Sequence, residues 1–562
     1  MNQITAILKT LSENKKAVSK THQNRAGGES YYRSLKEQVI QVLSTGTLGN
    51  TFYASGAELA AEAIEVLFEA RNACPEFLAR ALVWARNEGL MKTLPVLGLA
   101  ILSGGGGHTK KHFEAAFPRV VLIPDDLFTF VEIVKSGIIP GRKGLGGMTV
   151  APVANYLANI SEYHAVKYGS GKSKGITLAD AIRLSHPRAG SAELAERLGW
   201  IVNGPKGLRD DVAMNPQIRA FEALKAATDE TEIASLIREG RLPFEAVVPA
   251  VLKMTPVLWA ELLRQAPYMN LLRNLETFTR HGIFKEEENV RYAVSKLTNA
   301  RAVEHSKVLP FRFWNAWQVY SKNEECDARI ADALRDALEL SFANMPSFGE
   351  KTVAVGTDVS GSMGNLILND DDDEGYYCRS TKYVSRSDVP PKSGMRYIDI
   401  AGIFTGALLR KIEGRAIPLP FDGDIRHDHG LSTRDDIMTT VEKVARLDGG
   451  STAVGAPIEY LLNRKIVTDV FIGITDNEDW AHGRGYSCSS DFLTLWRRYR
   501  KEVAPDCKAF LVTVAPYNDA VAPAGEPGIR FIYGWSEKVL NYIGLALESG
   551  ETQVQAIEKM EL

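Results

Sequence analysis

At 562 residues the chain is longer than one hydrophobic core usually organises, so we expect two or more domains. Its content of 45% hydrophobic and 24% charged residues is that of an ordinary soluble globular protein. The 66 Lys and Arg residues nearly balance the 69 Asp and Glu residues. The overall charge therefore neither favours nor excludes a nucleic-acid partner, and any site for a polyanion must come from local clustering of basic side chains.

The cysteine content indicates a reducing environment. The cysteines are scattered and odd in number, which fits neither a disulfide framework nor a pair of Cys-x-x-Cys zinc sites: Cys74, Cys326, Cys378, Cys488 and Cys507. The first residues lack the basic start and long apolar run of a secretory signal. The longest apolar run, residues 95–102, is far too short to cross a bilayer. We therefore expect a cytoplasmic protein with no membrane partner.

The first part of the chain has a helical pattern. Apolar residues recur at helical spacing from about residue 30 to about 345, for example at 59–68 and 76–86. Amphipathic helices separated by short polar or Gly/Pro breaks predict helix pairs stacked as a solenoid, and residues 76–89, 242–265 and 268–281 fit helix-turn-helix units. No repeated residue signature accompanies them. We predict an all-α helical-repeat domain over residues 1–345.

A basic stretch lies within this part. Gly169-Ser-Gly-Lys-Ser-Lys-Gly175 resembles the end of a phosphate-binding loop, but Val166 stands where that motif needs glycine. The motif also needs a preceding strand, whereas residues 155–168 have a helical pattern, so an NTPase site fails on both counts. The remaining cations form a candidate RNA-binding surface: Lys167, Lys172, Lys174, Arg183, His186 and Arg188. Clustered positive charge binds phosphates with salt-sensitive affinity, although a solvated loop is the alternative that charge alone favours.

After Pro346 apolar strand-like runs alternate with helical segments. Strands are predicted at residues 352–355, 416–421, 467–474, 509–514 and 529–533, and helices at 397–411, 435–446, 456–463, 492–503 and 536–547. Strand and helix in turn predict a largely parallel, doubly wound α/β sheet covered on both faces. We predict this second domain over residues 346–562. Its insert, which begins at Asn369-Asp-Asp-Asp-Asp-Glu374, is expected to be a solvated loop, with a lid or a weak cation site as the alternatives.

Oxygen-bearing residues follow the first strand of this second domain. In an open α/β sheet, ligands bind at the carboxyl ends of the strands, which is where Asp358, Ser360 and Ser362 fall. Thr452 in a glycine-rich loop and Asp476 at the end of another strand could complete the same shell. One or two carboxylates with neutral hydroxyls suit Mg²⁺ better than a soft metal. Taken singly, Asp358 is better explained as a helix cap and Asp476 as part of an Asx turn, so the metal site is predicted from the set together.

Together, these three loops resemble the metal-ion-dependent adhesion site (MIDAS) of von Willebrand factor A domains, which are Rossmann-like. The resemblance implies direct or water-mediated ligation of one Mg²⁺ by Asp358, Ser360, Ser362, Thr452 and Asp476. It also implies an open coordination position that accepts an acidic side chain of a protein partner.

A second resemblance concerns the helical part. Four stretches are similar to landmarks of the TROVE domain, the HEAT-like helical-repeat ring of Ro proteins: Asp126-Leu-Phe-Thr-Phe130, Asp180-Ala-Ile-Arg-Leu-Ser-His186, Leu271-Leu-Arg-Asn-Leu275 and Pro310-Phe-Arg-Phe313. Ro proteins carry a TROVE ring followed by a von Willebrand A domain, which is the order seen here. The chain as a whole resembles a bacterial-type Ro protein.

The Ro resemblance implies an outer surface that binds small noncoding Y RNA and a central hole that takes single-stranded 3′ ends of misfolded RNA. By position, Y RNA contacts fall on Lys167, on Lys172 or Lys174, and on His186. One departure is Gly144-Leu-Gly-Gly-Met148, where such proteins usually carry Gly-Arg and a basic pair; here Arg142 and Lys143 lie upstream. The outer site could therefore be weakened or relocated.

We therefore predict a non-catalytic RNA-binding protein that offers RNA ends to an exoribonuclease or surveillance partner. A ring closed within one chain would permit a monomer. One alternative is a Mg²⁺-dependent protein adaptor that does not bind RNA. Another is a Mg²⁺-dependent hydrolase, although two-metal cleavage of RNA would need a further carboxylate group.

Overall fold

The computed structural model describes residues 23–45, 56–137, 139–142, 144–169, 175–209, 214–343, 345, 347–364, 395–447, 449–517, 519–523, 525–536, 538–549 and 552–562. The acidic insert, Lys143, Lys172 and Lys174 lie outside the described residues.

The first part of the described chain is helical except for one short strand, β1 (Tyr31–Tyr32). Its α-helices are α2 (Leu35–Thr45), α3 (Gly56–Ala73), α4 (Pro75–Asn87), α5 (Thr93–Ser103), α6 (Gly107–Val120), α7 (Pro124–Lys135), α8 (Val150–Leu157), α9 (Glu162–Gly169), α10 (Leu178–Ser185), α11 (Ala192–Asn203), α12 (Pro216–Ala226), α13 (Glu230–Gly240), α14 (Phe244–Ala250), α15 (Pro256–Gln265), α16 (Tyr268–Arg280), α17 (Glu287–Leu297), α18 (Ala300–Ser306), α19 (Pro310–Tyr320) and α20 (Ala328–Ser341). Short 3-10 turns join some of them, at η1 (Gly147–Thr149), η2 (Gly204–Gly207) and η3 (Ile283–Lys285).

The helical pattern read from the sequence is confirmed, with two corrections. Residues 76–89 and 268–281 were expected to be helix-turn-helix units, but each is essentially one helix, α4 and α16, because no Gly or Pro interrupts the apolar period. Residues 155–168 were read as one helix, whereas the chain breaks between α8 and α9. The assignment to HEAT-type repeats stays a prediction.

The second part contains a five-stranded parallel sheet with strand order β3-β2-β4-β5-β7. Its strands are β2 (Val353–Asp358), β3 (Ala416–Phe421), β4 (Val470–Thr475), β5 (Lys508–Thr513) and β7 (Ile529–Tyr533). The helical elements are η4 (Gly361–Gly364), α21 (Tyr397–Lys411), α22 (Ile437–Ala445), α23 (Ala456–Asn463), α24 (Phe492–Glu502), α25 (Lys538–Ser549) and α26 (Gln553–Glu558). The predicted α/β fold class is therefore confirmed.

The two faces of the sheet belong to different cores. Side chains alternate along each strand, so Val353 and Val355 face one side of the sheet and Ala354 faces the other. The first side packs with α21 and α22 and is continuous with the core of the helical part. The second side packs with α23 and α24 in a separate cluster. One face of the sheet thus shares its hydrophobic core with the helical part.

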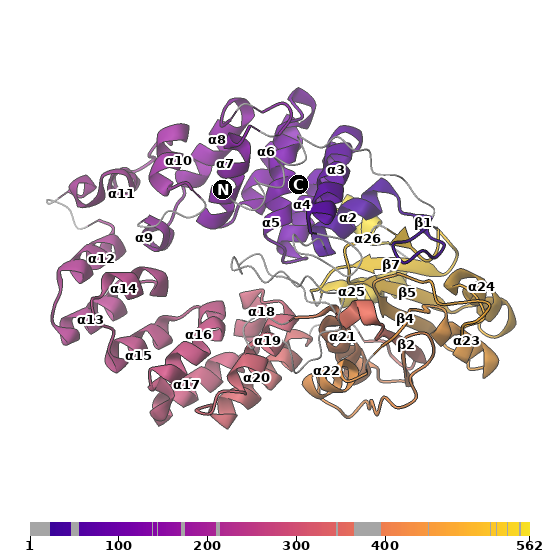
Figure 1. The fold of residues 1–562 in the computed structure, drawn as a ribbon. Helices are drawn as coiled ribbons and strands as arrows, with labels where there is room; N and C mark the ends of the chain where they lie inside the picture. The colour runs from indigo at the N-terminus through magenta and orange to yellow at the C-terminus, as the bar shows by residue number, and fades with distance from the viewer. Residues whose placement is uncertain are drawn as a thin grey trace.

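The helices form an arc whose two ends both meet the α/β domain (Figure 1). At the first end, α2 contacts β7, and the C-terminal helix α26 returns to pack on α4. At the other end, α19 contacts α21 and α20 contacts α22. Consequently the described elements run as a closed ring, with the sheet domain joining the two ends of the arc.

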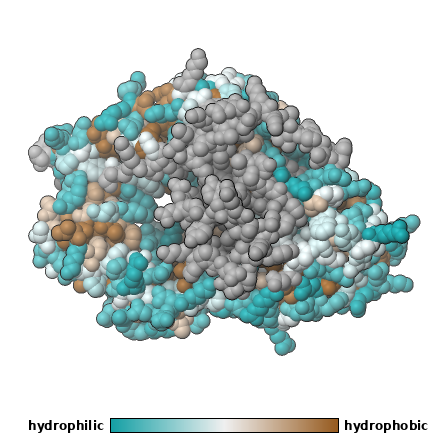
Figure 2. All heavy atoms as spheres, viewed as in Figure 1, coloured by the Kyte–Doolittle hydropathy of each residue, from teal (hydrophilic) through white to brown (hydrophobic). Residues whose placement is uncertain are grey.

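The visible surface differs between the two parts. Figure 2 shows a mainly hydrophilic α/β domain at the right, while hydrophobic residues gather in places on the helical arc. The exposed large hydrophobic side chains of the arc include Leu122, Leu184, Leu252 and Val257. Within the described ranges, none of the helices is long and apolar enough to span a membrane.

Candidate functional site

The predicted metal residues lie where two neighbouring parallel strands end. Residues of β2 and β4 are paired up to Thr357 and Ile474, so the loops that follow these strands lie side by side. Each predicted metal residue is at most 3% exposed: Asp358, Ser360, Ser362, Thr452 and Asp476. Buried polar side chains in such a place must be satisfied by one another or by a ligand.

Hydrogen bonds bring four of these side chains together. The Ser360 and Ser362 hydroxyl oxygens lie 3.2 Å apart, and the Ser362 hydroxyl donates to Asp476. Thr475 Oγ1 donates to Asp358 Oδ2 over 2.6 Å, which ties the end of β4 to the end of β2. The first two loops therefore present two carboxylates and two hydroxyls to one small region.

Thr452, the fifth predicted residue, is anchored beside this group through its backbone. Its carbonyl oxygen accepts hydrogen bonds from the N–H groups of Trp480 and Ala481, 3.1 and 2.9 Å away, in the loop after β4. The adjacent Gly450 carbonyl accepts from Gly361 N at 3.1 Å. The glycine-rich loop is thus fastened to both of the other loops.

The two carboxylates lack a positive partner in these contacts. Burial, and then the neighbouring charge of Asp476, raises the pKa of Asp358. Burial likewise raises the pKa of Asp476. The groups bonded to them are hydroxyls and backbone N–H groups, which carry no full charge. A bound divalent cation would offset this cost, and an all-oxygen donor set fits Mg²⁺.

Metal sites built from several Asp, Glu, His or Cys side chains differ from the carboxylate and hydroxyl set at the ends of β2 and β4. Within the part of the chain that the structure describes, no group of three or more His, Cys, Asp or Glu side chains is arranged to hold a metal ion. The site at the strand ends has two carboxylates and depends on hydroxyl oxygens for the rest.

Two further buried carboxylates follow Asp476, and sequence reasoning gave them no role. Asp479 accepts hydrogen bonds from Val454 N at 3.0 Å and from Phe492 N at 3.1 Å, so it holds the glycine-rich loop and the start of α24 against the end of β4. Glu478 is fully buried. The run Asp476-Asn-Glu-Asp479 directly after a buried strand was the available signal.

The predicted RNA-binding cations that the structure describes, Lys167, Arg183, His186 and Arg188, lie on α9 and α10 or just beyond α10. Arg183, His186 and Arg188 are exposed on α10 and just beyond it, with His186 ending the helix in a left-handed conformation at φ 49°. Asp180 is occupied as the cap of α10, where its carboxylate accepts from Thr177 N and Thr177 Oγ1 at 3.0 and 2.8 Å. The acidic residue of this stretch is thereby engaged in starting the helix.

Two other basic residues of this region are committed to internal contacts. Lys167 Nζ lies 2.7 Å from Glu245 Oε1 and near the ring faces of Tyr163 and Tyr168. Arg142 donates to backbone carbonyls, including that of Gly144 at 3.2 Å, and so organises the loop in which the sequence departs from the Ro pattern. The Lys167 ammonium group and the Arg142 guanidinium group are therefore both engaged in contacts within the protein.

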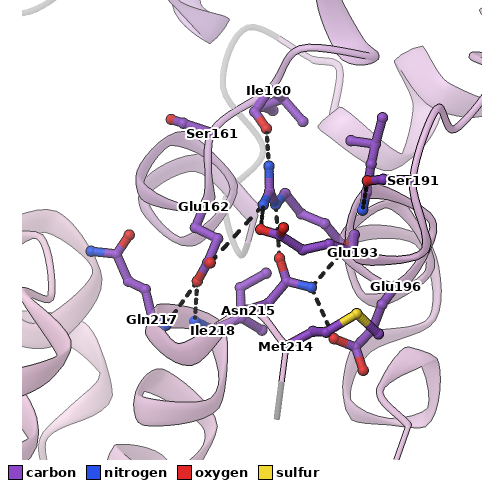
Figure 3. A network of polar contacts seen from close by, with 12 residues as sticks. Ile160, Ser161, Glu162, Ser191, Glu193, Glu196, Met214, Asn215, Gln217 and Ile218 are labelled. Atoms are coloured by element: carbon purple, nitrogen blue, oxygen red, sulfur yellow. Dashed lines mark hydrogen bonds and ion pairs between the residues drawn. The ribbon is translucent and has the colours of Figure 1, made fainter. Parts of the chain in front are cut away.

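A buried polar network fixes the position of α9 (Figure 3). Arg197 of α11 donates to Ile160 O at 2.7 Å and to Asn215 Oδ1 at 2.9 Å. Glu162 at the start of α9 accepts from Gln217 N at 2.8 Å and thereby caps α12. Three helices are joined by these bonds, which makes the base of the basic surface rigid.

Comparisons with known proteins agree with this architecture. The family profile described as TROVE domain matches residues 245–332, and the profile described as Ro60 vWA domain matches residues 400–544. The chain is 27% identical over 483 residues to "RNA-binding protein RO60" of Deinococcus radiodurans, covering 82% of this chain and 83% of that protein. It is 24% identical over 334 residues to "RNA-binding protein RO60" of Caenorhabditis elegans, covering 57% of this chain and 46% of that protein.

The fold is also similar to a solved structure, the crystal structure of the Deinococcus radiodurans RO (RSR) protein. The TM-score is 0.64 with 21% sequence identity, and the match covers 92% of this chain and 100% of that chain. This likeness supports the arrangement of ring and sheet described above.

Proposed function

We propose that the chain is a Ro-type RNA-binding protein, because the TROVE profile and the Ro60 vWA profile match it in this order. Both curated relatives reported above are named RNA-binding proteins. In detail, a small Y-like noncoding RNA binds the outer surface around α10, and single-stranded ends of misfolded RNA enter the ring. The protein acts without catalysis, in RNA quality control or in tethering a nuclease.

The observation that carries this proposal is the trio of exposed basic residues at the end of α10. Arg183, His186 and Arg188 are exposed on α10 and just beyond it, and they outnumber the one acidic residue of the helix, Asp180. Asp180 caps the helix and lies 3.7 Å from Arg183 Nη1, which leaves His186 and Arg188 outside that ion pair. Lys172 and Lys174 belong to the same stretch of sequence and lie outside the described residues. Phosphate groups of an RNA backbone are the ligands that such a cluster favours.

Charge reversal tests the surface directly. Arg183→Glu with Arg188→Glu should weaken the binding of a structured small RNA by at least about tenfold at low salt and reduce the salt slope by about 2, since roughly two phosphate contacts are lost. Arg446→Glu is the matched control, because Arg446 is exposed at the end of α22 on the α/β domain. Equal affinity and slope for the double variant and the parent would remove this surface from the RNA site.

A second function is favoured by the buried carboxylates at the strand ends. With Mg²⁺ held by Asp358, Ser360, Ser362, Thr452 and Asp476, the α/β domain would offer a coordination position to an acidic side chain of a protein partner. The chemistry that the cation supplies is attraction for a carboxylate, while the residues of the chain hold it and shape its surroundings. This adaptor role and RNA binding are compatible in one molecule.

A further inference from the structure

Residues 23–33, which precede the first helix, lie against the α/β domain and are called the strap here. Residues 23–29 form a tight hairpin in which Gln23 pairs with Glu29 and Asn24 N donates to Gly28 O over 2.8 Å. Residues Tyr31–Tyr32 then pair antiparallel with β6 (Asp519–Ala520). The strap thus packs as part of the α/β domain, although its residues precede the helical part in the sequence.

The tip of the strap binds the loop that carries the candidate metal ligand Asp476. Asn24 Nδ2 donates to the Asp479 carbonyl at 2.8 Å, and Ala26 N donates to Glu478 Oε2 at 3.0 Å. At Gly28 the backbone approaches so closely that a Cβ atom would lie 1.9 Å from the Asp479 carbonyl oxygen. Only glycine allows this contact without movement of the loop.

The loop after β4 has an unfavourable backbone conformation at one residue and two buried polar atoms without a hydrogen bond among the described residues. Asn477 has a left-handed backbone at φ 66°, and the Asn477 Oδ1 and Glu478 Oε1 atoms are buried without a hydrogen-bond partner among the described residues. Glu478 is 0% exposed and lies two residues from Asp476. Such a loop keeps its shape because its surroundings hold it. The strap is one of these surroundings, together with Val454 and with Phe492 at the start of α24, whose backbone N–H groups donate to the Asp479 side chain.

The strap also connects this loop to the helical ring. Arg25 at the hairpin tip forms an ion pair of 2.5 Å with Glu62 of α3, and both side chains are about one-fifth exposed. At the base of the strap, Arg33 donates to the Tyr533 hydroxyl and packs over the ring of Phe531. A continuous set of contacts therefore runs from α3 through Arg25 and the hairpin to the loop after β4.

We propose that the strap sets the geometry of the candidate cation site, with Asn24, Gly28 and Glu478 as positioning residues that hold the loop bearing Asp476. The ring and the metal loops are coupled through it, so cation binding tightens the strap and loss of the strap weakens cation binding. This inference rests on the proposed Mg²⁺ site.

Two substitutions in the full-length chain test the strap. Gly28→Ala forces the hairpin away from the Asp479 carbonyl, and Asn24→Ala removes both the bond to Asp479 and the bond that Asn24 Oδ1 accepts from Gly28 N. Each should raise the dissociation constant for Mg²⁺, measured by calorimetric titration, by about tenfold, which is the usual cost of losing a residue that orients a metal ligand. Gly107→Ala is the matched control, since an added Cβ there meets nothing within 4 Å.

A measurement on the parent protein needs no variant. Since coupling between two sites is reciprocal, Mg²⁺ should slow amide hydrogen exchange within residues 24–30. Unchanged Mg²⁺ affinity in both strap variants, with exchange of residues 24–30 indifferent to Mg²⁺, would overturn the strap proposal while leaving the cation site in place. If the parent and Asp358→Ala titrate alike, the cation site itself is wrong and the strap has no part in cation binding.

Discussion

Asp358 and Asp476 lie together in a buried place, and neither carboxylate has a basic partner among the residues that the structure describes. Their pKa values are raised because burial penalises the ionised form, and the charge of Asp476 adds to this effect at Asp358. In the absence of a cation, the folded protein therefore favours the protonated carboxyl groups, whereas cation binding requires the ionised carboxylates. The stability of the protein should therefore reflect both the cost of burying these charges and the gain from binding a cation.

Asp358→Asn should have opposite effects with and without Mg²⁺. Without the ion, the variant should be more stable than the parent by about 1–2 kcal/mol near neutral pH, because each unit of pKa elevation corresponds to about 1.4 kcal/mol. With Mg²⁺, only the parent should gain stability, because the variant has lost a ligand. Denaturant unfolding with and without Mg²⁺ measures both effects, and Asp506→Asn, an exposed carboxylate, is the control.

The difference in stability between Asp358→Asn and the parent should also depend on pH. The folded-state pKa of Asp358 is raised above its unfolded value, so the stability contributed by the bound proton is fully present below about pH 3.9 and is lost as the pH rises through the raised pKa. Without Mg²⁺, the stability advantage of Asp358→Asn over the parent should therefore grow between about pH 4 and pH 8. A constant difference across this range would show that Asp358 is not a strained carboxylate.

At the scale of elements, the basic surface depends on how α9 is held. Arg197 joins the α8–α9 turn to Asn215 before α12, and its side chain is 14% exposed. A guanidinium with several partners in a half-buried place is difficult to replace, because each partner left behind loses its hydrogen bond.

Arg197→Ala should destabilise the protein by about 2–3 kcal/mol, since buried acceptors are left unpaired. Amides of α9 should then exchange faster than those of α19, which is remote from the network. Arg291→Ala is the control, because that side chain is 72% exposed and surface substitutions usually change stability by less than about 0.5 kcal/mol. Equal stability of the Arg197 variant and the control would contradict the importance of this network.

The elements themselves were largely predictable from the sequence, for reasons visible in particular residues. The strands Ala416–Phe421 and Ile529–Tyr533 and the helices Tyr397–Lys411 and Ala456–Asn463 have the predicted limits, because apolar runs there stop at polar or glycine residues. The strap was not predicted, since Tyr31–Tyr32 pairs with residues far along the chain and has no local strand pattern. Likewise, the one local signal for the burial of Glu478 is its place just after a buried strand, and nothing local predicts that Lys167 pairs with Glu245.

For the whole molecule, the far closure of the ring combines the shared hydrophobic core with a small polar contact between α20 and α22. Glu339 Oε1 accepts from Ile437 N at 2.8 Å and so caps α22, and Arg335 pairs with Asp436 at 2.8 Å. The side chains of Arg335 and Asp436 are about one-third exposed, so their ion pair adds little by itself. The cap formed by Glu339 is the stronger constraint.

Glu339→Ala should leave Ile437 N without its acceptor and lower stability by about 1 kcal/mol, the usual cost of one lost hydrogen bond, while Asp436 still caps α22 by accepting from Thr439 N. Glu339→Gln keeps an acceptor for Ile437 N and should behave like the parent. Hydrogen exchange of α20 and α22 measures the effect. If Glu339→Gln and Glu339→Ala exchange alike, this bond does not hold the closure.

The central claim is that this chain, which is similar to Ro proteins, binds RNA through the cations at the end of α10. Crosslinking of the full-length protein in its native cells, followed by sequencing of the copurified RNA, tests the claim most directly. We predict enrichment of one abundant small structured RNA with the parent and with Arg446→Glu, and its loss with Arg183→Glu/Arg188→Glu. Absence of any enriched RNA from the parent would contradict the RNA-binding account and favour the Mg²⁺-dependent adaptor.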